Sequence, residues 1–153
     1  MSFKSTDDIL AYAIDKEKEA VAFYTELSQK DNFKSVKETF LNFAGEEQKH
    51  VAMLQGLTKN KASIVGYEVK SIPDLKISDY LVDIEYEEGM FMNDILRLAM
   101  KREENAVKLY KDLGSRSDSA EFKKIFQILV QEESKHKLAL ESMYDDFLAD
   151  NEN

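Results

Sequence analysis

The sequence predicts an all-α protein in which two similar helical hairpins form a four-helix bundle. Three observations support this prediction. The 153 residues include only five glycines and one proline, a composition that favours helix. Apolar residues recur at helical spacing in four segments. The third and fourth of these segments repeat the first and second, since the repeats begin at Asp8 and Asp94, 86 residues apart.

The first predicted hairpin covers residues 8–57. Its first helix, over about 8–28, and its second, over about 34–57, each carry an apolar stripe at three- and four-residue spacing. Asp31 and Asn32 are expected to form the turn between them. The stripes contain Leu10, Ala13, Ala20, Tyr24 and Leu27 in the first helix and Val36, Phe40, Phe43, Leu54 and Leu57 in the second.

The second predicted hairpin covers residues 93–147. Its first helix is expected to end at Gly114 as a C-cap, and its second to run over about 119–147 before a frayed tail at 148–153. The segment "DILAYAIDKEKEAVAFYTEL" (8–27) aligns with "DILRLAMKREENAVKLYKDL" (94–113), and residues 40–57 align with 126–143 without a gap. The chain is therefore interpreted as an internal duplication of one hairpin.

The segment between the hairpins, residues 58–92, lacks a helical stripe and holds the only proline, Pro73. It contains "SIVGYEV", which predicts a short extended piece, and a short helix that Ser78 would cap. Its length is sufficient to cross the ~30 Å of a 20-residue helix. One long crossover between two antiparallel hairpins is the ferritin-like arrangement, so residues 1–153 are expected to form a single ferritin-like domain.

Composition excludes several classes of function. A net charge of −9 argues against nucleic-acid or anionic-membrane partners, because either needs a concentrated basic surface. With no cysteine, thiolate metal sites and disulfides are excluded. No window approaches the ~18 apolar residues of a membrane span, and the N-terminus lacks a signal-peptide pattern, so a cytoplasmic location is expected.

Acidic and histidine side chains interrupt the apolar stripes at matching places in the two hairpins. Burial of an ionised carboxylate without a partner costs several kcal/mol, and no lysine or arginine falls on the stripes. Two divalent cations would balance four carboxylates, which predicts a dinuclear metal site. Its expected ligands are Glu17, Glu47, His50, Glu103, Glu133 and His136.

The spacing of these residues supports the same interpretation. A Glu and a His three residues apart share one helix face, so both reach one ion. One Glu from each of two helices, with Glu-x-x-His from each of the other two, is the ligand set of ferritin-like di-iron or di-manganese proteins. A lone core histidine is usually structural, but two in duplicated Glu-x-x-His motifs favour metal binding. The zinc-protease motif, with two histidines four apart, is absent.

In "DKEKEAVAFYTEL", "GEEQKHVAML", "KREENAVKLYKDL" and "QEESKHKLAL" the chain resembles the ferritin-like domain of the rubrerythrin family. The resemblance implies terminal metal ligands at Glu17 and Glu103, bridging ligands at Glu47 and Glu133, and histidine ligands at His50 and His136. It also implies a di-iron centre that reduces hydrogen peroxide to water with electrons from outside, and a homodimer.

Two differences from rubrerythrins limit this transfer. The chain lacks the four cysteines of a rubredoxin-like iron site, so electrons would have to come from a separate donor protein. Rubrerythrins also carry a further glutamate three residues after the third-helix ligand, where this chain has Ala106.

Four residues near the expected ligands have two interpretations each. Tyr24 and Tyr110 lie two helical turns after Glu17 and Glu103, where their hydroxyls would contact ligand carboxylates or their rings would only pack the core. Glu46 and Glu132 would orient the histidines or would be ordinary surface acids. Glu19, Glu26 and Glu104 are expected on outward, solvated faces.

The leading hypothesis is a non-haem di-iron oxidoreductase of peroxidase or ferroxidase type. Carboxylate-rich sites with one imidazole per metal favour iron or manganese over zinc. Two alternatives stay open at this point: an iron-binding or storage protein, and a bundle whose metal, such as zinc, is structural.

Overall fold

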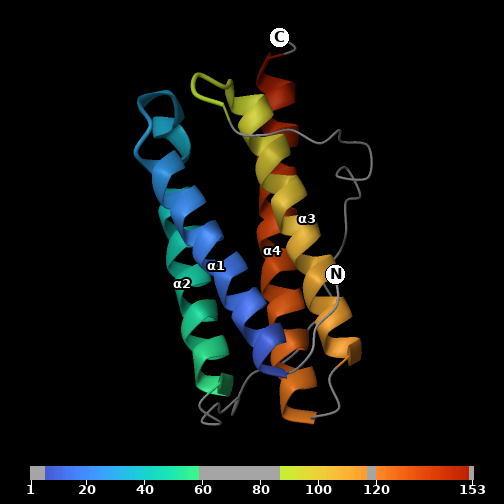
Figure 1. Cartoon of the computed structure of the whole chain (residues 1–153). Coiled ribbons are helices and arrows are strands. Elements are labelled where there is room, and N and C mark those ends of the chain that lie inside the picture. The colour runs from blue at the N-terminus through green and yellow to red at the C-terminus, as the bar shows by residue number, and fades with distance from the viewer. Residues whose placement is uncertain (1–5, 59–86, 117–119, 152–153) are drawn as a thin grey trace. The chain divides into compact units, whose positions relative to one another are not determined.

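The computed structural model describes residues 6–58, 87–116 and 120–151, drawn in colour in Figure 1. Within these ranges the chain is helical and contains no strand. The elements are α1 (Thr6–Ser28), the 3₁₀-helix η1 (Asp31–Val36), α2 (Lys37–Thr58), α3 (Met92–Arg116) and α4 (Ala120–Asn151). The four expected helices are thus present, and the all-α fold class is confirmed.

The described residues fall into two compact units. The first contains α1, η1, α2, the last residue of α3 (Arg116) and the beginning of α4 up to Ile125; the second contains the rest of α3 and of α4. We refer to α1 and α2 as hairpin 1 and to α3 and α4 as hairpin 2. The expected extended piece at 63–69 and the helix capped by Ser78 lie outside the described residues. No helix in the described ranges is both long and apolar enough to cross a lipid bilayer.

The turn of hairpin 1 is more structured than the sequence suggested. The α1 helix ends with two i−3 hydrogen bonds, in which Gln29 N donates to Glu26 O (3.1 Å) and Lys30 N donates to Leu27 O (3.2 Å). Lys30 is extended (φ −83°, ψ 132°), and η1 follows directly. Phe33 leaves helical geometry at φ −118° and places its ring in the core, where it is 2% exposed. The turn is therefore fixed by one buried aromatic side chain.

Both hairpins contain the same aromatic pair at the positions that the duplication relates. In hairpin 1, Tyr24 of α1 stacks on Phe40 of α2, with ring centroids 5.8 Å apart and planes at 28°. In hairpin 2, Tyr110 of α3 stacks on Phe126 of α4 at 6.0 Å and 20°. Residues 24 and 40 correspond to 110 and 126 at the 86-residue offset. The duplicated sequence therefore forms the same aromatic pair in each hairpin.

The expected ends of hairpin 2 need correction. Gly114 is not a C-cap: α3 continues through it to Arg116, and its φ is not positive. The Ser115 hydroxyl donates to the Asp112 carbonyl (2.7 Å) in this last turn. The α4 helix continues to Asn151, so four residues of the tail that was expected to fray are helical.

The turn that precedes α3 contains the one described glycine with positive φ, Gly89 (φ 85°). The Met90 amide donates to the Glu87 carbonyl across this turn (3.3 Å). The carbonyl of Phe91 then accepts from the amides of Asp94 (3.1 Å) and Ile95 (3.0 Å), which starts α3.

Substitution of these two glycines by alanine should have opposite effects on stability. A Cβ at Gly114 would meet the Phe126 Cβ at an ordinary 3.5 Å. Gly114→Ala should therefore raise the free energy of unfolding by up to about 1 kcal/mol, through helix propensity. Gly89→Ala should lower it by roughly 1 kcal/mol, because its conformation is left-handed. Urea denaturation of both variants checks this, and a stabilising Gly89→Ala would contradict the turn geometry.

Candidate metal centre

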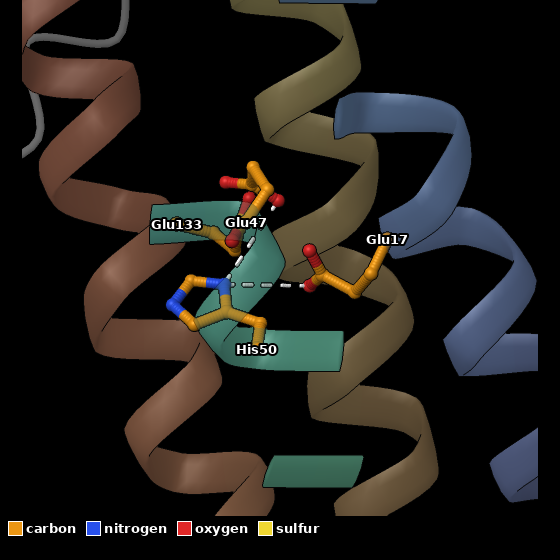
Figure 2. Close-up of side chains that lie close together, drawn as sticks. All are labelled: Glu17, Glu47, His50 and Glu133. Carbon is orange, nitrogen blue, oxygen red and sulfur yellow. Dashed lines mark ion pairs between the residues drawn. The ribbon is translucent and has the colours of Figure 1, made fainter. Parts of the chain in front are cut away.

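Hairpin 1 places three of the predicted metal ligands together. Glu17 lies at the middle of α1, and Glu47 and His50 lie one turn apart on α2. All three side chains are buried, with exposures of 2%, 1% and 3%. Figure 2 shows both carboxylates directed at the imidazole, with His50 Nδ1 at 3.6 Å from Glu17 Oε1 and 3.9 Å from Glu47 Oε2.

Hairpin 2 repeats this arrangement with Glu103 of α3 and Glu133 and His136 of α4. Their exposures are 2%, 1% and 2%. His136 Nδ1 lies 3.6 Å from Glu103 Oε1, the same separation as in the His50–Glu17 pair. The helices present these side chains because each occupies a place on the apolar stripe that the sequence predicted.

In each hairpin the three side chains can direct one ligand atom each to a common point. The three ligand atoms lie within 4.8 Å of one another in hairpin 1, and likewise in hairpin 2. Two carboxylate oxygens and one imidazole nitrogen form a donor set that suits iron or manganese. Each hairpin therefore carries a buried carboxylate–histidine cluster that is compatible with one ion of a di-iron site.

The environment of hairpin 1 retains protons on its ligands when no metal is bound. Burial raises the pKa of Glu17 from 4.5 to about 8, and the neighbouring Glu47 adds to this effect. Burial lowers the pKa of His50, but the adjacent carboxylates of Glu17 and Glu47 outweigh it and raise that pKa from 6.5 to about 10. A metal ion that binds here must displace these protons.

The structure places the other predicted residues as follows. Tyr24 and Tyr110 are both 1% exposed, and their rings lie in the aromatic pairs described above, which supports the packing interpretation. A contact of their hydroxyls with ligand carboxylates stays a prediction. Glu46 and Glu132 are half-buried. Glu132 forms an ion pair with Lys135 (3.3 Å), as a helix-surface acid does.

The expectation that Glu104 lies on a solvated face is wrong, since it is 6% exposed. Lys101 and Lys108, on the same helix, lie 3.6 and 3.3 Å from its carboxylate oxygens. Lysines three residues before and four residues after an acid are a sequence signal for this arrangement. Glu141 of α4 is also buried (1%) and lies 4.0 Å from Lys137; the sequence analysis did not identify it.

Comparison with known proteins agrees with the fold. The rubrerythrin family model matches residues 8–93 and 94–153. A hypothetical protein from Pyrococcus furiosus is 31% identical, with a TM-score of 0.70, and the match covers 95% of this chain and 91% of that one. A crystal structure of an uncharacterised conserved protein from Magnetospirillum magnetotacticum MS-1 is 22% identical, with a TM-score of 0.67 and coverages of 94% and 95%. No curated protein matches the chain.

The fold and the comparisons together identify the structural class and the family of this protein. The helices and the solved structures that resemble them place the chain among ferritin-like four-helix bundle proteins, as the sequence predicted. The family model covers almost the whole chain, so the protein belongs to the rubrerythrin family.

The stability of the metal-free protein should fall as pH rises. The folded state holds the Glu17 proton up to pH about 8 and the His50 proton up to about 10, whereas the unfolded chain releases them near 4.5 and 6.5. The folded state thus binds more protons between about pH 5 and 10, so the free energy of unfolding decreases across that range.

Urea denaturation of chelator-treated protein at pH 5 to 9 measures this slope. Glu17→Gln should flatten it below pH 8 by up to about 1.4 kcal/mol per pH unit, the value for one proton. Glu26→Gln, at an exposed position of the same helix, serves as the control and should leave the slope unchanged. An identical slope for wild type and Glu17→Gln would show that Glu17 is not protonated in the folded state.

Proposed function

We propose that this protein is a non-haem di-iron oxidoreductase that reduces peroxide or O₂ with electrons from a separate donor. The observation that carries the proposal is the buried Glu–Glu–His cluster that both hairpins repeat with the same 3.6 Å carboxylate–histidine separation. Membership of the rubrerythrin family supports it. If the clusters only stabilised the fold, neither hairpin would need three buried ionisable side chains.

In this proposal the two clusters together hold two ions. Glu17 and Glu103 act as terminal ligands, Glu47 and Glu133 as bridges, and His50 and His136 supply one nitrogen to each ion. Four carboxylates then balance the four positive charges of two divalent ions, which removes the cost of burying them. Iron is favoured because the donors are mainly carboxylate oxygens, with manganese as the next candidate.

The protein's own side chains would act mainly by binding the metal ions and by excluding bulk water from them. Two ferrous ions, when bound, supply the two electrons that reduce one peroxide. The ligand side chains are at most 3% exposed, so bulk water has little access to them. Glu17 and His50 would give up their retained protons as metal binds, which makes metal affinity rise with pH.

Electrons would come from a separate protein, because the chain has no cysteine with which to build an iron–sulfur donor site of its own. A homodimer and a cytoplasmic location complete the proposal. Size-exclusion chromatography tests the first. It also separates the proposed enzyme from an iron-storage cage, which would elute as a very large particle.

The reaction itself is tested by rapid mixing of the ferrous protein with hydrogen peroxide under anaerobic conditions. The proposal predicts a di-ferric absorption band that forms far faster than peroxide oxidises the same concentration of free Fe(II). Iron that binds but oxidises no faster than free iron would favour storage or a structural role. Zinc found by elemental analysis, in protein made without an affinity tag, would favour a structural metal.

Removal of the histidine from either cluster should lower the iron content of the protein by the same amount. His50→Ala and His136→Ala should each reduce bound iron from two ions per chain toward one, because each removes the only nitrogen donor of its cluster. Glu19→Ala, at an exposed position two residues from Glu17, should keep both ions. Elemental analysis after Fe(II) loading and desalting makes the measurement. Unchanged iron in both histidine variants would contradict the assigned ligands.

A further inference from the structure

Hairpin 2 has one end at which exposed apolar side chains gather. Its helices are antiparallel, since Glu103 of α3 lies beside His136 of α4 and Tyr110 lies beside Phe126. Phe91 precedes Glu103 by twelve residues and Leu148 follows His136 by twelve, so both lie at the same end of the hairpin. Figure 1 shows this end where α3 begins and α4 finishes.

The apolar side chains at this end are unusually accessible. Phe91 is 75% exposed and Leu148 is 37% exposed; among the described residues the one other large apolar side chain with comparable exposure is Leu41, at 40%. The backbone of Phe91 is held in place, because its carbonyl accepts the first hydrogen bonds of α3. With its backbone fixed, only the few rotamers of the aromatic side chain remain to be ordered on binding.

Acids predominate at this end among the described residues of hairpin 2; the first basic side chain of α3, Arg97, lies 3.7 Å from Asp94. Exposed acids occupy both sides of the end: Glu87, Glu88, Asp145, Asp146 and Asp150. Residues 87–96 and 138–151 contain no lysine or arginine. We call these five acids, with Phe91 and Leu148, the acidic end of hairpin 2. Exposed apolar side chains accompanied by acids at one end of a hairpin favour a protein-binding surface.

We propose that the acidic end of hairpin 2 is the docking site of the electron donor, a redox protein whose apolar contact patch is ringed by lysine or arginine. This inference rests on the proposed function, which requires an outside donor. Opposite charges would steer the donor to this end and fix its orientation, and Phe91 would fill the apolar centre of the contact. A second copy of this chain is a poor occupant, because like charges would meet.

The distance between the acidic end of hairpin 2 and the metal ligands determines which kinetic constant donor docking controls. Twelve helical residues separate Phe91 from Glu103, about 18 Å along the axis, so the donor does not touch the metal ligands. Each donor gives one electron, and two electrons with two protons convert one hydrogen peroxide to two waters. Changes at the acidic end should therefore alter the KM for the donor and leave kcat for a saturating donor unchanged.

Mitochondrial ferrocytochrome c, a basic one-electron donor, serves as the probe. Its oxidation by hydrogen peroxide is followed with the iron-loaded protein at low ionic strength. Glu87→Lys with Glu88→Lys should raise KM by about tenfold or more, as local charge reversal does for steered partners. The control pair Glu19→Lys with Glu26→Lys makes the same change in net charge on exposed positions of α1 and should change KM less than about twofold.

A second pair tests the apolar centre. Phe91→Ser should raise KM for ferrocytochrome c, whereas Leu41→Ser, at the exposed apolar position in hairpin 1, should not. Equal effects of the two charge-reversal pairs, or of the two serine variants, would overturn the proposal. Calorimetric titration of the same variants with ferricytochrome c measures docking without turnover. If the wild type binds at the acidic end but dithionite-reduced protein does not react with peroxide, the proposed function fails while the docking site stands.

Discussion

The need to neutralise buried carboxylates is the constraint on which the rest of the structure depends. Four glutamates lie on stripes that otherwise carry apolar side chains, and each is at most 2% exposed. Ionised and unpaired, each would cost several kcal/mol, comparable with the whole stability of a small domain. Without metal, hairpin 1 meets this constraint with protons, as the raised pKa values of Glu17 and His50 show. With metal, two divalent cations would meet it instead.

Because the hairpin is duplicated, one sequence pattern accounts for both buried clusters. One hairpin pattern supplies a buried carboxylate on each helix, a histidine and an aromatic stack, and its repetition supplies the same set again. The two copies differ mainly away from these side chains. Hairpin 2 buries two further acids, Glu104 and Glu141, beside lysines of their own helices. Lysine thus neutralises acids that do not face a cluster, whereas the cluster acids have no lysine on their stripes.

Periodicity predicted the four helices and the burial of all six predicted ligands, because a residue's place on a helical stripe decides its exposure. It did not predict local events at helix ends. A glycine at position 114 signals a cap only if the chain must turn there, and α3 continues instead. Phe33 fixes the turn through burial, a tertiary contact that local sequence does not reveal. Glu104 is buried because Lys101 and Lys108 flank its carboxylate, a pairing that stripe position alone does not predict.

Anomalous diffraction at the iron absorption edge, from crystals of the iron-loaded protein, tests the central claim most directly. The account predicts two iron peaks per chain, one beside Glu17 and His50 and the other beside Glu103 and His136, with Glu47 and Glu133 in contact with both. A single peak, or iron bound away from these six side chains, would contradict it.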